Sequence, residues 1–183
     1  MTRCARMFRR FRDDEEGSIA VETLLIVPVI FWVYLTMFSI FDAYRHHSIN
    51  QKAAYTIGDI ISRETTPIDG SYMQGTRELL AYLTANEASK VAIRVTSVKY
   101  DAENDVYKRD WSHTQGWVPK LGNNEVSALR DDLPVLPHNE RVMVVETFAK
   151  YEAPFNTGLS DREIHNFVFT RPRYAPRVLW SDG

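Results

Sequence analysis

Cysteine is almost absent from this sequence of 183 residues, since Cys4 is the only one. The rest of the chain must therefore fold without disulfides, and a metal site with cysteine ligands is excluded there. Basic residues are not in excess either, because 22 Lys and Arg stand against 24 Asp and Glu, for a net charge of −2. Without a basic patch to neutralise phosphates, nucleic acid is not an expected partner.

Catalytic signatures are also missing. The sequence contains no G-x-S-x-G, H-E-x-x-H, Walker loop or G-x-G-x-x-G. The acidic group Asp101, Glu103 and Asp105 lacks the glycine and the final glutamate of a calcium loop, and we expect it to form a hairpin turn. His46 and His47 are adjacent and point in different directions on a helix, so they form no chelating pair. We therefore expect no enzymatic activity, no cofactor and no metal site.

Charge is nearly absent from one long run, Ile19 to Phe41, whose only charged residue among 23 is Glu22. About 20 apolar residues are enough to cross the hydrocarbon core of a bilayer. Between Leu24 and Phe41 only Thr36 and Ser39 are polar, which is too few to form the polar face of a helix packed on a soluble core. The run is therefore predicted to be a transmembrane helix, with the lipid bilayer as a partner.

The flanks of this run predict its orientation. The segment before it is rich in arginine, whereas Asp42, Arg45 and two histidines follow it. Basic residues stay on the cytoplasmic side, so we expect a cytoplasmic N-terminus and a head outside, in the periplasm of a two-membrane bacterium. The run is too long for an ordinary secretory signal peptide, and no small-x-small cleavage site follows it. The arginines are Arg3, Arg6, Arg9, Arg10 and Arg12.

The order of features around the run carries a family resemblance. A basic leader and four acids precede Gly17 and Ser18, Glu22 follows, and Pro28 lies inside the apolar run. This order resembles the class III signal of type IV pilin-like proteins. It is most similar, over residues 8–41, to the TadE/TadF pseudopilins (minor pilins) of the tight-adherence (Flp) pilus system.

The resemblance implies that a prepilin peptidase cuts between Gly17 and Ser18. The expected divisions are then a leader at 1–17, a transmembrane helix and stalk at 18–66, and a periplasmic head at 67–183. The resemblance further implies residence in the bacterial inner membrane, with a place in a cell-surface pilus as a further step. The implied partners are other pilins and pseudopilins and the inner-membrane assembly platform.

The residues also support a physical reason for this arrangement. A glycine leaves a protease groove unobstructed and extends easily. Cleavage would leave a positive amine on Ser18, one helical turn from Glu22. A carboxylate in lipid is costly unless it is paired, and the amine of a neighbouring subunit is a suitable partner. The alternative is that Glu22 snorkels to the nearby cytoplasmic interface.

The helix is predicted to continue beyond the membrane as a stalk. Ile49, Ala53, Ile57 and Ile61 recur every four residues, which is an amphipathic helical pattern. Pro67 disfavours helix at the residue before it, so a helix from Ser18 should end near Glu64. Pro28 removes one backbone hydrogen bond, and a kink is expected there.

The remainder predicts a pilin-like α+β head of about four antiparallel strands and two shorter helices. Ser71 is expected to begin a capping box for a helix over 71–86. Asn123 or Asn124 is expected to cap a second, short helix that ends before Pro134. Trp111 and Trp117 are expected to be core or half-core residues rather than surface anchors.

The strands are predicted from the alternation of apolar and polar residues. A strand begins at Val91, and its apolar phase changes after Ser97, so a bulge is expected there. The next strand should place Tyr107, Arg109 and Trp111 on one face and form a hairpin with the first. The nearly continuous apolar run 141–151 indicates a central strand covered on both faces, and 164–170 a fourth strand.

Three functions are to be weighed against these features. The first is a minor pseudopilin that a peptidase processes after Gly17. The second is an uncleaved, single-pass, membrane-anchored periplasmic binding or sensor protein. The third, a membrane-tethered enzyme, has no constellation of residues in its support.

Overall fold

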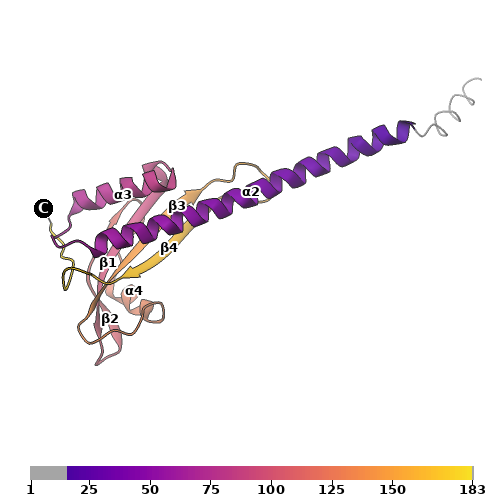
Figure 1. The fold of residues 1–183 in the computed structure, drawn as a ribbon. Coiled ribbons are helices and arrows are strands. Elements are labelled where there is room, and N and C mark those ends of the chain that lie inside the picture. The colour runs from indigo at the N-terminus through magenta and orange to yellow at the C-terminus, as the bar shows by residue number, and fades with distance from the viewer. Residues whose placement is uncertain (1–15, 183) are drawn as a thin grey trace, which may run out of the picture. The chain divides into compact units, whose positions relative to one another are not determined.

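The computed structural model describes residues 16–182 and shows an α+β fold (Figure 1). The leader predicted at 1–17 therefore lies almost wholly outside the described residues. A long N-terminal apolar helix is followed by an antiparallel sheet of four strands with shorter helices, as predicted. The elements are α2 Glu16–Ser62, α3 Gly70–Thr84, β1 Val91–Asp101, β2 Val106–Gln115, α4 Asn123–Ala128, β3 Arg141–Tyr151 and β4 Arg162–Thr170, with 3-10 turns at Ala88–Lys90 and Leu129–Asp131.

The chain forms two compact units, and each is considered by itself. The described part of the first unit comprises residues 16–42 of α2 and the segment Ala153–Ser160, hereafter the 153–160 loop. The second unit comprises Ala43–Glu152 and the residues from Asp161 onward. It contains the C-terminal part of α2 and the whole sheet.

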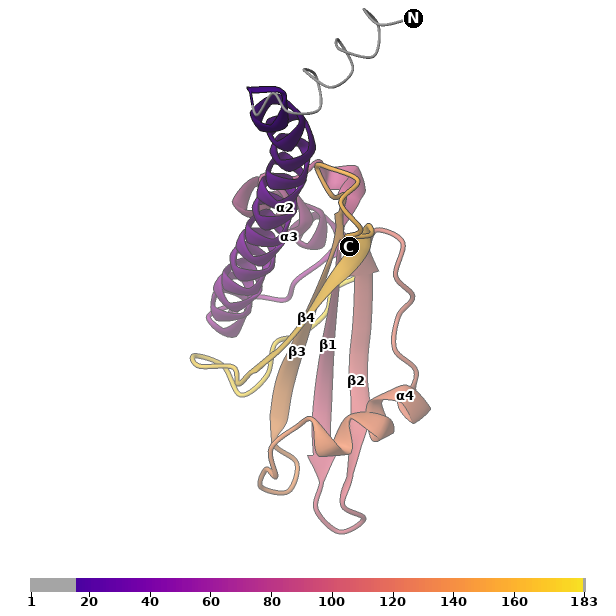
Figure 2. The same ribbon diagram turned by 90° about the vertical axis from the view of Figure 1, so that its right-hand side faces the viewer.

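The sheet of the second unit has the strand order β2-β1-β3-β4, and every pairing is antiparallel. The central strand predicted at 141–151 is β3, and nearly all of its residues are buried. Such a continuous apolar strand requires cover on both faces. The C-terminal part of α2 and α3 lie on one face, and α4 lies on the other (Figure 2).

The stalk part of α2 packs through a stripe of small and branched side chains. Ala53, Ile57 and Ile61 are buried, as their spacing predicts, while Ile49 is half-buried. Gly58 completes the stripe, because a Cβ built there would lie 3.3 Å from Val168 Cγ1 on β4. The absence of a side chain at this position lets the helix backbone approach the sheet closely.

The predicted bulge is present, and its extra residue is in β2. The register shifts between Ser97 and Val98, which pair with Trp111 and Arg109, so Asp110 is the unpaired residue. The expectation that Trp111 shares a face with Tyr107 and Arg109 is wrong, because an extra residue inverts the alternation beyond it. The Trp111 indole instead donates a hydrogen bond to the carbonyl of Val178 at 3.0 Å.

The predicted N-caps are wrong by one or two residues. The cap of α3 is Asp69, whose carboxylate accepts the Tyr72 N–H at 2.8 Å, while the Ser71 hydroxyl donates to the same carboxylate at 2.8 Å. The cap of α4 is Gly122, whose N–H donates to the Glu125 carboxylate at 2.6 Å.

The side chains that were expected to cap the helices form other hydrogen bonds. Asn123 accepts a hydrogen bond from the N–H of Arg109 at 3.3 Å and so helps to hold α4 against β2. An aspartate in an extended conformation is among the best N-caps, and Asp69 takes this role two residues before the serine.

A second layer of core lies between α4 and the sheet. Tyr107 is fully buried there, at 0% exposure, and its ring centroid lies 5.0 Å from that of Tyr100. The hydroxyl of Tyr107 donates to the carbonyl of Pro134, which ties the chain after α4 to this layer. The other buried members are Val98, Leu121, Val126, Leu133, Leu136, Val142 and Val144.

Gly116 is where the chain leaves β2 and turns over the sheet. Its φ is +111°, and a Cβ built there would lie 2.5 Å from the Cβ of Ala92. Gly158 has a similar φ of +94°, but nothing lies within 4 Å of its Cβ position. A side chain at either glycine would therefore strain the backbone, and the two positions differ in steric contact.

We predict that Gly116→Ala destabilises the protein more than Gly158→Ala does. A non-glycine residue at such a φ costs about 1–3 kcal/mol, and only Gly116→Ala adds a clash with the sheet. Denaturant unfolding of the detergent-solubilised chain, followed by tryptophan fluorescence, measures both free energies of unfolding. Equal losses would show that the chain near Gly116 moves away from Ala92 at no cost.

Candidate functional site

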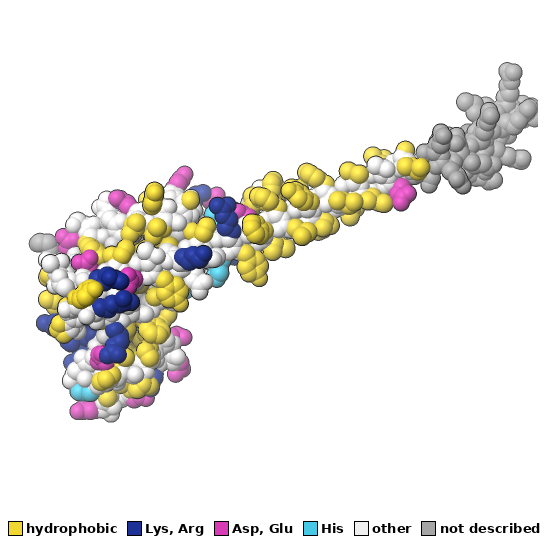
Figure 3. All heavy atoms as spheres, in the orientation of Figure 1, with side chains coloured by type: hydrophobic (Ala, Val, Ile, Leu, Met, Phe, Trp, Pro, Cys, Tyr) yellow, Lys and Arg dark blue, Asp and Glu magenta, His cyan; other side chains and the backbone are white. Residues whose placement is uncertain are grey.

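The first candidate site is the exposed apolar segment of α2. All of residues 19–41 are exposed except Leu35, Thr36 and Ser39. Among the described residues, α2 is the one helix long and apolar enough to cross a membrane. Apolar side chains cover this part of the helix (Figure 3). A long, solvent-facing apolar helix of this kind fits a single-pass membrane protein.

The polar side chains within this segment are satisfied by the helix itself. The hydroxyl of Thr36 donates to the carbonyl of Trp32 at 2.9 Å, and that of Ser39 donates to Leu35 at 3.0 Å. Backbone and hydroxyl groups in lipid must find partners within the protein. These two residues therefore present little polar surface to a bilayer.

The four residues singled out in the sequence lie on α2, which begins at Glu16; they are Gly17, Ser18, Glu22 and Pro28. Ser18 and Glu22 are four residues apart on this helix and so one turn apart. Glu22 is exposed, and no side chain among residues 19–182 forms an ion pair with it. Pro28 lies inside the helix, which continues past it, and the kink there remains a prediction. The cut between Gly17 and Ser18 also remains a prediction.

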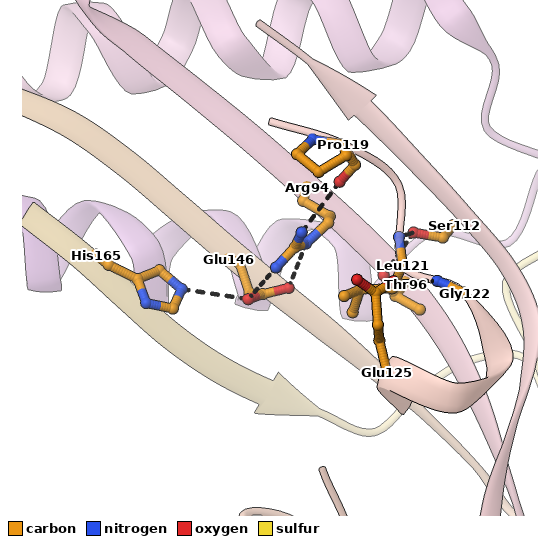
Figure 4. Close-up of polar contacts among 9 residues, drawn as sticks. All are labelled: Arg94, Thr96, Ser112, Pro119, Leu121, Gly122, Glu125, Glu146 and His165. Atoms are coloured by element: carbon orange, nitrogen blue, oxygen red, sulfur yellow. Dashed lines mark hydrogen bonds and ion pairs between the residues drawn. The ribbon is translucent and has the colours of Figure 1, made fainter. Parts of the chain in front are cut away.

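A second candidate site was not found from the sequence. Arg94 of β1, Glu146 of β3 and His165 of β4 meet on the face of the sheet opposite α2 (Figure 4). The Arg94 guanidinium binds the Glu146 carboxylate through two hydrogen bonds, Nε to Oε2 at 2.6 Å and Nη2 to Oε1 at 2.7 Å. His165 Nε2 lies 3.2 Å from Oε1 of the same carboxylate.

This polar cluster of Arg94, Glu146 and His165 is mostly buried. The side chain of Arg94 is 13% exposed and that of Glu146 is 4% exposed, whereas His165 is 46% exposed. Phe148 forms its apolar wall, because the His165 ring stacks on it at 4.5 Å between centroids and the Arg94 guanidinium lies 5.5 Å from its centroid. The carboxylate is thus held from two sides, and the imidazole is the most exposed member of the cluster.

The polar cluster also holds the chain that follows Gly116. Arg94 Nη1 donates to the carbonyl of Pro119 at 3.0 Å. Next to it, the Ser112 hydroxyl pairs with that of Thr96 at 2.8 Å and accepts the Leu121 N–H at 3.1 Å. Figure 4 shows these contacts side by side. The arrangement fastens the 116–121 segment to the sheet and contains no nucleophile next to a base.

The acidic group after β1 forms a hairpin turn, as predicted. Asp101 accepts from Lys108 at 2.6 Å, Asn104 at 2.9 Å and the Glu103 N–H at 3.1 Å. The Lys108 ammonium is the main reason that the pKa of Asp101 lies well below its usual range. Asp105 is similarly engaged by Arg130 at 2.8 Å.

Metal ligands do not gather in the part of the chain that the structure describes. Within residues 16–182 no three His, Cys, Asp or Glu side chains are placed to hold a metal ion. His46 instead packs its ring against Tyr151, at 5.3 Å between centroids. Comparisons with protein-family models, with curated proteins and with solved structures found no match. The functional argument therefore rests on the residues themselves.

The two tryptophans considered as surface anchors differ. Trp111 is half-buried, which confirms the expectation for it. Trp117 is exposed, at 39%, so the expectation of a core or half-core position is wrong for it. Its indole donates to Glu163 at 3.0 Å, and the Lys150 ammonium lies 4.7 Å from its ring centroid. Both indole N–H groups are thus used within the chain.

We predict that breaking the buried ion pair costs more than replacing both partners. Removing one member of such a pair costs about 3–5 kcal/mol, since the other charge is left buried alone. Arg94→Met and Glu146→Leu should each show this loss of unfolding free energy, and the double variant should lose less than either single variant.

The control is the exposed pair Lys90–Glu152, whose side chains are 36% and 60% exposed. Lys90→Met should cost no more than about 1 kcal/mol. Additive losses for the Arg94 and Glu146 variants in denaturant unfolding would mean that the two side chains are not coupled.

Proposed function

We propose that this protein is a minor pseudopilin, cut after Gly17 by a prepilin peptidase, that takes part in assembling a Tad/Flp-type pilus or its secretion machinery. The observation that carries the proposal is the character of α2. One uninterrupted helix of 47 residues has an exposed apolar segment with a single carboxylate at Glu22, and its C-terminal part docks on an antiparallel sheet.

The chemistry of assembly follows from the position of Glu22. Cleavage would create a positive amine on Ser18, within one turn of this carboxylate on the same helix. In a low-dielectric environment an unpaired carboxylate is costly, and an opposite charge on a neighbouring helix offsets the cost. Side-by-side packing of apolar segments, shifted along the axis by about one turn, would bring the amine of one subunit to the carboxylate of the next.

The helical state of Gly17 bears on how a peptidase would reach the bond. Gly17 and Ser18 lie in the first turn of α2, whereas a protease groove binds an extended chain. The first four N–H groups of a helix have no partners within it, so opening the first turn breaks few hydrogen bonds. The low helix propensity of glycine reduces that cost further.

A second candidate function is an uncleaved, membrane-anchored binding or sensor protein. Its support is the polar cluster, in which the half-exposed His165 covers a buried Arg94–Glu146 pair. An imidazole at the surface above a buried charge pair is a plausible contact point for a ligand. This reading needs neither a cut at Gly17 nor a pairing role for Glu22.

We predict that Gly17→Ala leaves an unprocessed precursor, because a side chain at this position obstructs the peptidase groove. Expression with a prepilin peptidase, followed by mass spectrometry of the N-terminus, should show Ser18 first in the wild type and the uncut leader in the variant. Gly75→Ala is the control, since nothing lies within 4 Å of that position, and it should be processed normally. A wild-type N-terminus at Met1 or Thr2 would instead favour the anchored sensor.

We predict that Glu22→Ala is processed normally yet fails to associate with other pilins, because the Ser18 amine of its neighbour loses its counter-charge. Co-purification of tagged pilins from membranes measures this loss. Glu78→Ala is the control, because Glu78 is exposed on α3 and bonds only Gln74, at 3.1 Å, among the described contacts. Undiminished association of Glu22→Ala would show that the carboxylate merely snorkels.

A further inference from the structure

The 153–160 loop joins β3 to β4 and differs in composition from its surroundings. Its sequence, APFNTGLS, contains no charged residue, and an acid flanks it on each side, Glu152 and Asp161. The other hairpin turn, Asp101–Asp105, carries three acids by contrast. The 153–160 loop instead carries Pro154, Phe155 and Leu159.

The loop belongs to the same compact unit as the apolar part of α2. The rings of Phe155 and Phe38 meet edge to face, with centroids 5.8 Å apart. The three residues of the apolar segment that are buried or half-buried, Leu35, Thr36 and Ser39, lie within one turn of Phe38. The loop therefore lies beside the apolar segment near its C-terminal end (Figure 1).

The position of Phe38 along α2 gives the depth in a bilayer at which the loop would meet the helix. Phe38 is three residues before Phe41, the last residue of the apolar run, which corresponds to about 4.5 Å along the axis. If Ile19–Phe41 crosses the bilayer, this level is the boundary between headgroups and acyl chains. Trp and Tyr are enriched at that boundary, and Phe is among the apolar residues that interfacial elements bury in it.

The surface of the loop matches the same boundary. Phe155 remains 41% exposed after its contact with Phe38, so part of its ring faces outward. The Thr157 N–H donates to the Phe155 carbonyl at 2.9 Å, but a short loop cannot satisfy all its backbone groups internally. An irregular segment is excluded from the hydrocarbon core for that reason, although it is tolerated at the hydrated boundary.

We propose that the 153–160 loop is a second membrane-contacting element, with Phe155 inserted at the lipid interface where the apolar segment of α2 ends. The occupant of its exposed apolar surface is lipid, because that surface is continuous with the lipid-facing surface of α2. The proposal rests on α2 crossing a membrane and is independent of cleavage at Gly17. A second copy of the protein covering Phe155 is the competing occupant.

The test uses environment-sensitive probes on single cysteines in the full chain. Cys4→Ser removes the one natural thiol, and Asn156→Cys, Met37→Cys or Asn104→Cys then takes an NBD label. Asn156 reports the loop, Met37 the apolar segment of α2, where it is 67% exposed, and Asn104 the charged β1–β2 turn. Each protein is reconstituted in phosphatidylcholine–phosphatidylglycerol vesicles that contain nitroxide lipids labelled at the headgroup or along the acyl chain.

The Asn156 probe is expected to be quenched, and more by the shallow nitroxide than by the deep one. The Met37 probe should be quenched as well, and the Asn104 probe should not. An Asn156 probe that behaves like the Asn104 probe while Met37 is quenched overturns the proposal and leaves the membrane helix intact. If the Met37 probe is not quenched either, α2 is not in the bilayer and both proposals fall.

Matched phenylalanine variants identify the residue responsible. Phe155 and Phe169 have similar exposure, 41% and 44%, but only Phe155 is in the loop. In the Asn156 probe background, Phe155→Asp should abolish quenching, whereas Phe169→Asp and Phe155→Leu should retain it. Equal quenching in Phe155→Asp would overturn the assignment. The Asn156 probe with Phe155 unchanged is also measured in vesicles that each contain many copies of the protein. If its quenching disappears there, a second copy of the protein, not lipid, covers the exposed surface of the loop.

Discussion

The close approach of α2 to the sheet is the contact on which the second unit depends. The helix presents small and branched side chains to the sheet, and at Gly58 it presents none. Interiors are packed as densely as crystals, and a Cβ at this position would lie 3.3 Å from Val168 Cγ1, which would then have to shift by a few tenths of an ångström. The same helix carries the exposed apolar segment, so one element has a packed face in its C-terminal part and exposed apolar side chains in its N-terminal part.

The two faces of the sheet are stabilised by different kinds of contact. The face toward α2 and α3 is held by apolar packing of buried side chains that include Met73, Leu80, Val95 of β1 and Val145 of β3. The opposite face combines an apolar half under α4 with the polar cluster around Glu146. A bidentate arginine–carboxylate pair has stricter geometry than apolar contacts. The polar cluster therefore fixes the position of the 116–121 segment.

The periodic parts of the fold could be predicted from the sequence, and the parts that depend on strand register could not. The central strand 141–151, the buried stripe at Ala53, Ile57 and Ile61, and the bulge near Ser97 all follow from local alternation. The polar cluster depends on which residue of β1 lies opposite Glu146, and this information is in the pairing rather than in either strand. Arg94 is the single charge within 91–98, and Glu146 is the single charge within 142–149. Two opposite charges in otherwise uncharged stretches were the available signal that they pair.

The bulge at Asp110 has a consequence for comparing this chain with related sequences. On one side of this residue, odd positions of β2 face α4, and on the other side they face the opposite layer. A relative that lacks the extra residue would keep its hairpin while presenting its tryptophan to the other layer. Alignments of β2 that place a gap anywhere but at this position would therefore equate residues that sit in different cores.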